Sequence, residues 1–198
     1  MDTFLQIWGS TFLAAQKGLF LFSEWPRGGK YTVSPIFKLI GWWIFLIGLP
    51  AWLIIFAQKG NWIAMSVETC GVAGIILGIV NLHKKQPFSE KWLDTFTLVC
   101  VALGVTISLY DVGGLTKTTQ FLELSLSAGY LVGTYLLASK KHPTLQPYGY
   151  LSYVVMNGSS SWLMFSQEKY VFAVQQVLSL TCMLLAFIFS YQRMRRLR

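Results

Sequence analysis

Long apolar stretches separated by short polar segments make up almost the whole chain. Seven of them are long enough to form membrane-spanning helices, because a hydrocarbon core about 30 Å thick needs about 20 helical residues. They cover residues 4–23, 38–57, 62–82, 93–110, 119–138, 147–166 and 170–191. Pro and Gly, which interrupt helices, fall mostly between the stretches, where turns are needed. The pattern predicts an all-α polytopic membrane protein with seven transmembrane helices.

The first stretch is the weakest of the seven. Gln6, Ser10, Gln16 and Lys17 interrupt its apolar pattern. Two interpretations stay open, a spanning helix or an amphipathic helix that lies along the membrane interface. With seven spans the N-terminus is external, and with six it is cytoplasmic.

Basic residues alternate between the loops, and this alternation predicts the orientation of the chain. Every second loop is rich in Lys and Arg, whereas the others carry only Lys59, Lys117 or Lys169. Lys and Arg near a span resist translocation, so the basic loops mark the cytoplasmic side. The tail 193–198 holds four arginines. We therefore expect a cytoplasmic C-terminus, in the cytoplasmic membrane of a bacterium.

Composition and motifs argue against several other classes of protein. Of the 198 residues, 54% are hydrophobic and 12% are charged, whereas a soluble domain has about 25% charged residues. The net charge of +8 lies at helix ends and in the tail, where it meets lipid headgroups, so we expect a bilayer and no nucleic acid as partner. No His, Cys or carboxylate set has metal spacing, and no protease, hydrolase or nucleotide motif occurs. We expect no cofactor, no metal and no enzymatic activity.

An internal repeat organises the stretches. The segment 51–59 (AWLIIFAQK) resembles 161–169 (SWLMFSQEK), and FLQ at 4–6 resembles FLE at 121–123. This pairing predicts two three-helix repeats that run parallel because one helix links them, in a 3+1+3 order. The predicted units are a first repeat over residues 1–91, a linker helix within 92–118, a second repeat over 119–192 and a basic tail over 193–198.

A competing register of the repeat also exists. KKQP at 84–87 resembles KKHP at 140–143, at a spacing of 56 residues. This register would match the third helix with the fifth. Two lysines and a proline are common at a cytoplasmic helix end, so the register stays an alternative.

Polar side chains inside the stretches are the candidate functional residues, because an unpaired polar group in hydrocarbon costs several kcal/mol. The spacing of Tyr150, Tyr153 and Asn157 puts them on one face of the sixth helix. Gln175 and Gln176 lie at a similar depth in the seventh. Rings and amides facing one another predict a site for a small polar solute that contains a ring. Alternatively, the amides only pair helices and the tyrosines only mark the interface.

Three further residues enter the candidate set on weaker grounds. For Glu123, near the start of the fifth helix, and Glu68, two turns into the third, solute contact and helix pairing both stay open. At the spacing of 110 residues that relates 51–59 to 161–169, Trp43 matches Tyr153 and Ile47 matches Asn157. This match adds Trp43 to the predicted site.

These features together resemble a known family. The 3+1+3 layout resembles the PnuC vitamin transporters and the related SWEET sugar transporters. The face Tyr150-x-x-Tyr153-x-x-x-Asn157 is similar to the Trp-x-x-Trp-x-x-x-Asn pattern of PnuC proteins, with Tyr in place of both Trp. The start of the fifth helix (FLE, 121–123) and the run from Tyr170 to Gln176 are similar to theirs as well.

The resemblance implies a function and a mechanism. It implies facilitated diffusion of a vitamin-like compound such as nicotinamide riboside, driven by cytoplasmic phosphorylation of the solute, without ion coupling. It also implies a homotrimer. The alternative is a non-transporting membrane scaffold, or a subunit of a larger complex, in which the repeat is vestigial.

Overall fold

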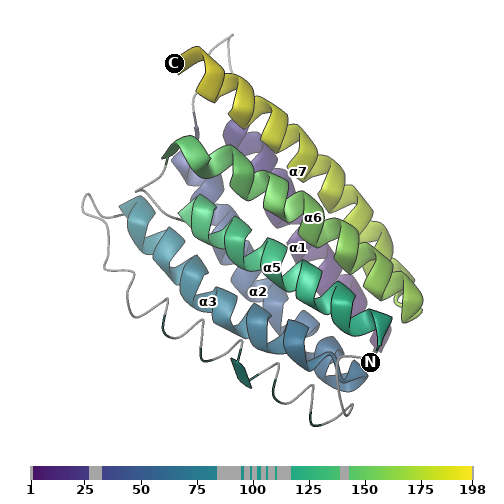
Figure 1. Cartoon of the computed structure of the whole chain (residues 1–198). Coiled ribbons are helices and arrows are strands. Elements are labelled where there is room, and N and C mark those ends of the chain that lie inside the picture. Colours follow the sequence, from purple (N-terminus) through teal and green to yellow (C-terminus); the bar gives the residue numbers. More distant parts are fainter. Residues whose placement is uncertain are drawn as a thin grey trace.

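The computed structural model describes residues 2–26, 33–83, 117–138 and 143–197, with scattered positions between 95 and 110. Its elements are α1 (Asp2–Glu24), α2 (Pro35–Lys59), α3 (Trp62–His83), α5 (Thr118–Ala138), the short 3-10 helix η1 (Pro143–Leu145), α6 (Gln146–Ser166) and α7 (Tyr170–Leu197) (Figure 1). All of these elements are helical, which confirms the predicted all-α class. The fourth predicted stretch, 93–110, lies mostly outside the described residues. A helix over this stretch therefore stays a prediction.

Six of the predicted stretches correspond to the six long helices that the structure describes. Most ends of these stretches lie within three residues of the observed helix ends. Among the described helices, α2, α3, α5 and α7 are long and apolar enough to cross a membrane. The main difference in length is at the end of α7, which continues through the arginines of the tail to Leu197. This agreement supports a membrane location for the protein.

The packing of α1 accounts for the polar residues in the first stretch. Gln16 and Lys17 are buried, whereas Phe4, Ile7 and Phe22 are exposed. The helix buries its polar side chains beside apolar ones such as Leu13 and Phe20 and exposes other large apolar side chains, an arrangement expected where polar residues lie within a membrane bundle. It packs along α2 and α7, which favours the spanning interpretation over the interfacial one.

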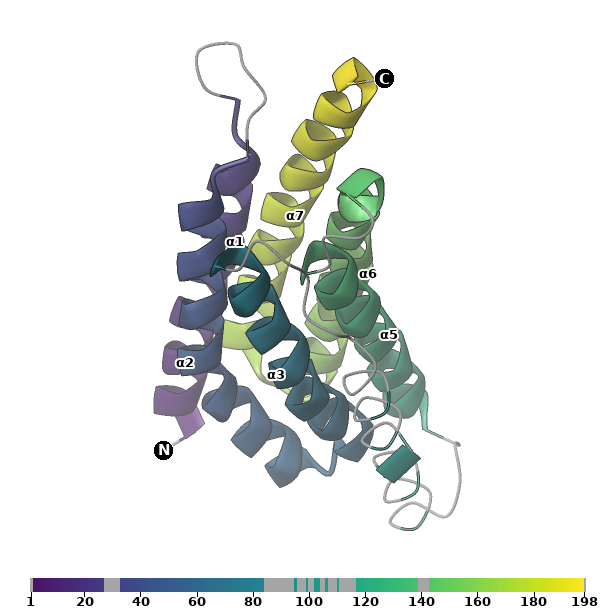
Figure 2. The same ribbon diagram turned by 90° about the vertical axis from the view of Figure 1, so that its left-hand side faces the viewer.

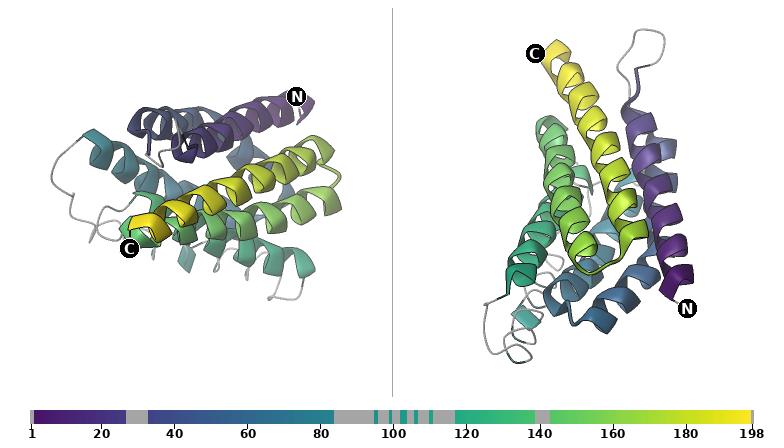
Figure 3. Two further views of the ribbon diagram at one scale, coloured as in Figure 1. Left: turned by 90° about the horizontal axis from the view of Figure 1, so that it is seen from above. Right: turned by 90° about the vertical axis from the view of Figure 1, so that its right-hand side faces the viewer.

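The six long helices form a closed ring. Within 1–83 and within 117–197, each long helix packs against its neighbour in the chain; α3 then packs against α5, and α7 packs back against α1. Figure 2 shows α3 between α2 and α5, and the right-hand view of Figure 3 shows α7 between α6 and α1. The ring therefore has an interior that every long helix can reach.

Contacts at the two ends of the ring give the directions of the helices. The Asn81 side chain, near the end of α3, donates from Nδ2 to the carbonyl oxygen of Ala138, the last residue of α5 (3.0 Å). The backbone N–H of Ala64, near the start of α3, donates to the Glu123 carboxylate near the start of α5 (3.2 Å). Helices α3 and α5 are thus parallel, and α1–α2–α3 and α5–α6–α7 follow the same order of directions (Figure 1).

Two turns of identical design follow α2 and α6. Gly60 (φ 67°) and Glu168 (φ 62°) are the residues with positive φ in the described part of the chain. The backbone N–H of Asn61 donates to the Phe56 carbonyl, and that of Lys169 donates to the Met164 carbonyl, both at 2.9 Å. In each turn a left-handed residue ends one helix and these bonds satisfy its last carbonyls. Glu168 follows Gly60 by 108 residues.

The buried faces of the two halves coincide in register. At the spacing of the turns, the matching pairs of α2 and α6 with both side chains buried include Trp42 with Tyr150, Phe45 with Tyr153 and Leu49 with Asn157. At the spacing between 4–6 and 121–123, the matching buried pairs of α1 and α5 include Gln6 with Glu123, Ser10 with Ser127 and Lys17 with Thr134. Equivalent positions of the two halves therefore face the interior.

The register expected for α2 and α6 needs a shift of two residues. The similar letters around Trp52 and Trp162 suggested the earlier match, but Trp52 is buried and Trp162 is 62% exposed. Trp52 lies eight residues before the left-handed residue of its turn and Trp162 only six. Trp43 and Ile47, matched earlier to Tyr153 and Asn157, accordingly lie on the outer face.

Candidate functional site

A small closed cavity lies at the centre of the ring. Its volume is about 10 Å³, which is the size that one water molecule needs. Its polar lining is Lys17 of α1, Glu68 of α3, and Gln175 and Gln176 of α7, and its aromatic lining is Phe45 and Trp52 of α2. Residues from both halves of the chain thus meet around one point in the interior.

Several polar atoms around this cavity have no hydrogen-bond partner among the described residues. They are Lys17 Nζ, Trp52 Nε1, Gln175 Oε1 and Gln176 Oε1. Buried polar groups in proteins are almost always paired, and an unpaired one costs about 1–3 kcal/mol. A set of unpaired donors and acceptors around one cavity is suited to bind a polar molecule.

Lys17 is a central member of the site that the sequence analysis did not select. Its ammonium nitrogen lies 4.0 Å from the centre of the Tyr153 ring, a cation–π distance. The Tyr153 hydroxyl shares a hydrogen bond with Thr134 Oγ1 (2.9 Å), which fixes the ring. The signal was present in the sequence, because a lysine within a membrane span is a functional candidate by default. In the hydropathy pattern the same lysine only weakens the first apolar stretch.

The predicted face of α6 is confirmed as one face. Tyr150, Tyr153 and Asn157 are all fully buried. Asn157 donates from Nδ2 to the Tyr153 carbonyl oxygen (2.7 Å), and its Oδ1 has no partner in the described structure. Met156 is the residue of α6 that lines the central cavity. Tyr153 is connected to the cavity through its ring contact with Lys17.

The two predicted glutamines of α7 line the cavity directly. Gln175 donates from Nε2 to Ser179 Oγ (2.6 Å), so its unpaired Oε1 is an acceptor held in place. Gln176 follows Glu68 by 108 residues, the same spacing as the two turns. Equivalent positions of α3 and α7 thus contribute a carboxylate and an amide to one cavity.

Three predicted site residues lie elsewhere. Glu123 binds the N–H of Ala64 at the start of α3, which is the helix-pairing role. Trp43 is 53% exposed on the outer face. Tyr150 faces the interior but belongs to a separate polar cluster at one end of the ring. The structure thus puts Gln175 and Gln176 in the cavity lining and Tyr153 against Lys17. It leaves Glu123, Trp43 and Tyr150 apart from the cavity.

Three stacked rings extend from the site across the ring of helices. The ring centres of Phe45 and Tyr130 are 5.9 Å apart, with 18° between planes. Those of Tyr130 and Tyr153 are 6.4 Å apart, with 27° between planes. Tyr130 of α5 fits because it faces Gly71 of α3, where an added Cβ would lie 2.0 Å from the Tyr130 hydroxyl oxygen. Close helix approach at small residues is typical of membrane bundles.

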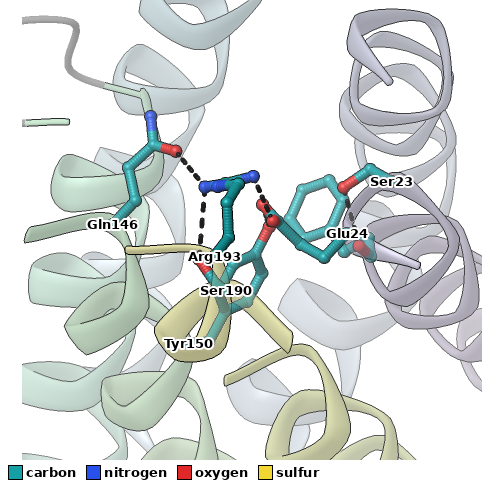
Figure 4. Close-up of polar contacts among 7 residues, drawn as sticks. Ser23, Glu24, Gln146, Tyr150, Ser190 and Arg193 are labelled. Atoms are coloured by element: carbon teal, nitrogen blue, oxygen red, sulfur yellow. Dashed lines mark hydrogen bonds and ion pairs between the residues drawn. The ribbon is translucent and has the colours of Figure 1, made fainter. Parts of the chain in front are cut away.

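One end of the ring is closed by a charged cluster. Figure 4 shows the Glu24 carboxylate at its centre. Arg193 of α7 forms an ion pair with it, and the Tyr150 hydroxyl donates to it (2.9 Å). Arg193 also donates to Gln146 Oε1 (3.5 Å) and Ser190 Oγ (3.3 Å). Because Glu24 belongs to the first half of the chain and Arg193 and Tyr150 to the second, this cluster joins the two halves.

The other end is closed by an amide pair. Asn61, between α2 and α3, donates from Nδ2 to Gln167 Oε1 (3.1 Å), and Gln167 donates from Nε2 to Asn61 Oδ1 (2.9 Å). Gln167 lies between α6 and α7. This pair also joins the two halves, at the turns of identical design.

A larger cavity lies at the charged end. Its volume is about 310 Å³, and Lys38, Trp42, Asn81 and Gln146 contribute to its lining. Trp42 is 1% exposed, and its ring centre is 4.8 Å from that of Phe20. Trp42 lines this cavity, and Phe45, about one turn later on α2, lines the central cavity.

Comparisons with known proteins found no matching family model, no matching curated protein and no matching solved structure. Among the described residues, no group of three or more His, Cys, Asp or Glu side chains is placed to hold a metal ion. The function has to be argued from the site itself.

Proposed function

We propose that this chain is a membrane transporter that lets a small, polar, ring-containing metabolite cross the bilayer by facilitated diffusion. The observation that carries the proposal is the set of unpaired polar atoms around a closed cavity inside the helix ring. Polar groups inside a membrane bundle are costly and commonly mark the path of a solute. The aromatic side chains Phe45 and Trp52 supply flat walls for a ring.

The two closed ends support a carrier rather than a channel. Each end is held by contacts between the first and the second half of the chain, Asn61 with Gln167 and Glu24 with Arg193. Rocking of the two halves about the cavity would break one set of contacts while the other holds, which is how alternating access works in repeat-built transporters. The interfaces of α1 with α7 and of α3 with α5 would be the hinges.

We further propose a linker helix and an orientation in the membrane. A linker helix within 93–110 would complete a 3+1+3 arrangement, and the charged end with Arg193 would face the cytoplasm. The resemblance to PnuC transporters adds a vitamin- or nucleoside-like solute, such as nicotinamide riboside, and a homotrimer. Trapping of the solute by phosphorylation would drive uptake.

Uptake into liposomes tests the function. The purified protein is reconstituted, and entry of labelled nicotinamide riboside and a panel of vitamins is measured against empty liposomes. Gln176→Leu should reduce apparent affinity roughly 5- to 150-fold, because one hydrogen bond to a desolvated solute contributes about 1–3 kcal/mol. Gln58→Leu, a change at an exposed glutamine of α2, is the matched control. No uptake of any compound by the wild type would favour the scaffold alternative.

A further inference from the structure

We propose that the central cavity selects zwitterionic aromatic solutes, holding the anionic group at Lys17 and the cationic group at Glu68. This inference rests on the proposed function in taking the cavity as the solute site. It narrows the class of solute to zwitterions, so singly charged compounds such as the nicotinamide riboside cation would be disfavoured. Lys17 and Glu68 come from different helices and line the same cavity. Both are buried, at 1% and 5% exposure.

The Lys17 ammonium is available for a solute. Its Nζ has no hydrogen-bond partner in the described structure, so the Glu68 carboxylate in the same cavity does not satisfy it by direct contact. Two opposite charges that share a cavity without bonding to each other can each take one end of a zwitterion. A solute with a single charge would leave one of the two buried groups uncompensated, which is strongly unfavourable.

The residues that line the cavity offer both unpaired donors and unpaired acceptors. Lys17 Nζ of α1 and Trp52 Nε1 of α2 are donors. Gln175 Oε1 and Gln176 Oε1 of α7 are acceptors, and the Glu68 carboxylate of α3 lines the same cavity. The donors fit a carboxylate, and the acceptors fit an ammonium or another cationic group.

The walls of the cavity fit an aromatic body beside the two charges. Trp52 stacks on Phe172 with ring centres 4.2 Å apart, and Phe45 stacks on Tyr130. These contacts hold the two lining rings in place. In this closed conformation the cavity is too small for such a solute, so binding requires one end of the ring to open.

A panel of matched probes tests the inference. Four pyridines share one ring and differ in charge: N-methylnicotinate is zwitterionic, nicotinate anionic, N-methylnicotinamide cationic and nicotinamide neutral. An indole set offers the same contrast, with tryptophan, indole-3-propionate, tryptamine and indole-3-propionamide. Affinity for the detergent-solubilised protein is measured by calorimetry. We expect a zwitterion to bind at least about 10-fold more tightly than its singly charged and neutral relatives, which corresponds to about 1.4 kcal/mol. Equal binding within both sets, or no binding of either zwitterion, would overturn the inference.

Variants assign the two ends of the solute. Lys17→Met should remove the preference for the zwitterion over the cation, and Glu68→Gln the preference over the anion. Lys59→Met and Glu168→Gln, at exposed positions, are matched controls that should leave binding unchanged. If Lys17 and Glu68 serve only to balance each other, the double variant Lys17→Met/Glu68→Gln will bind the zwitterion as the wild type does, and the inference fails. Should a variant not fold, the wild-type charge preference alone decides.

The outcomes separate this inference from the proposed function. Uptake of the same probes is measured in liposomes. Binding with the zwitterion preference but no uptake would retain the inference and overturn transport. Uptake without any charge preference would retain transport and overturn the inference.

Discussion

Asn61 and Gln167 exchange two hydrogen bonds between the turns that follow α2 and α6, with each amide both donating and accepting. This pair joins the two halves at the end of the ring opposite Glu24 and Arg193. It is only part-buried, and it involves neutral groups, so it is weak enough to break in the conformational change that we propose.

Removing this amide pair should open that end of the ring. In a background with Cys70, Cys100 and Cys182 replaced, a cysteine at Gln176 should react slowly with a membrane-impermeant thiol reagent. Adding Asn61→Leu should raise the reaction rate roughly 5-fold or more, since about 1 kcal/mol of closure is lost. Labelling from the Asn61 side measures the effect. An unchanged rate would mean that the pair does not close the path.

Breaking the charged cluster should destabilise the protein more than neutralising it. Arg193→Ala leaves the Glu24 carboxylate, whose side chain is 1% exposed, without its ion-pair partner, at an expected cost of about 3–5 kcal/mol. The double variant Glu24→Gln/Arg193→Gln should cost clearly less, because both members of the ion pair are removed together. Thermal unfolding in detergent of the wild type, Glu24→Gln, Arg193→Gln and the double variant completes a double-mutant cycle. Additive costs would show that the two residues do not interact.

The fit of Tyr130 against Gly71 can be tested by adding one methyl group. Gly71→Ala should destabilise the fold by about 1–3 kcal/mol, because the new Cβ would overlap the Tyr130 ring. Tyr130→Leu in the same chain should recover part of the loss. Gly18→Ala is the matched control, since nothing lies within 4 Å of an added Cβ there, and it should be neutral or slightly stabilising. Equal effects of the two alanines on the melting temperature would refute the packing argument.

The orientation of the chain follows from the loop charges and is open to labelling. Cysteines at Gln58 and Thr118, both exposed, should react with an impermeant reagent added outside intact cells. A cysteine at Arg195, exposed near the end of α7, should react only after the cells are opened. The reverse pattern would invert the topology.

Transport should equilibrate the solute rather than concentrate it. Glu68 is the carboxylate that lines the central cavity, and the chain has no nucleotide motif. We expect liposomes with an imposed proton gradient, and no trapping enzyme, to reach the external solute concentration and no more. Accumulation above that level, lost in Glu68→Gln, would instead make Glu68 a proton-coupling group.

Much of the fold could be predicted from the sequence, because hydropathy and turn residues report on one helix at a time. The spacing of Tyr153 and Asn157 predicts their burial on one face of α6, and both are buried, as are Gln175 and Gln176 of α7. These are properties of single helices and of one short turn. They need no knowledge of how distant helices meet.

The parts that could not be predicted depend on contacts between helices far apart in the sequence. The cation–π contact of Lys17 with Tyr153 joins α1 to α6. Neither stretch contains a signal that predicts this pairing. The register of the repeat failed for a related reason, because the similar letters at Trp52 and Trp162 outweighed the turn geometry at Gly60 and Glu168. With the two-residue shift, Phe45 and not Trp43 matches Tyr153, and Trp43 lies on the outer face.

The unlike ends of the ring respond differently to hydration. Opening the end with Glu24 and Arg193 lets water reach a carboxylate and a guanidinium, and each recovers part of a desolvation cost of several kcal/mol. Opening the other end hydrates two neutral amides, which recover much less. Hydration therefore favours the conformation of the empty bundle that is open at the Arg193 end. With the proposed orientation the unloaded carrier would rest facing the cytoplasm, and a return step without solute would be the slow part of net uptake.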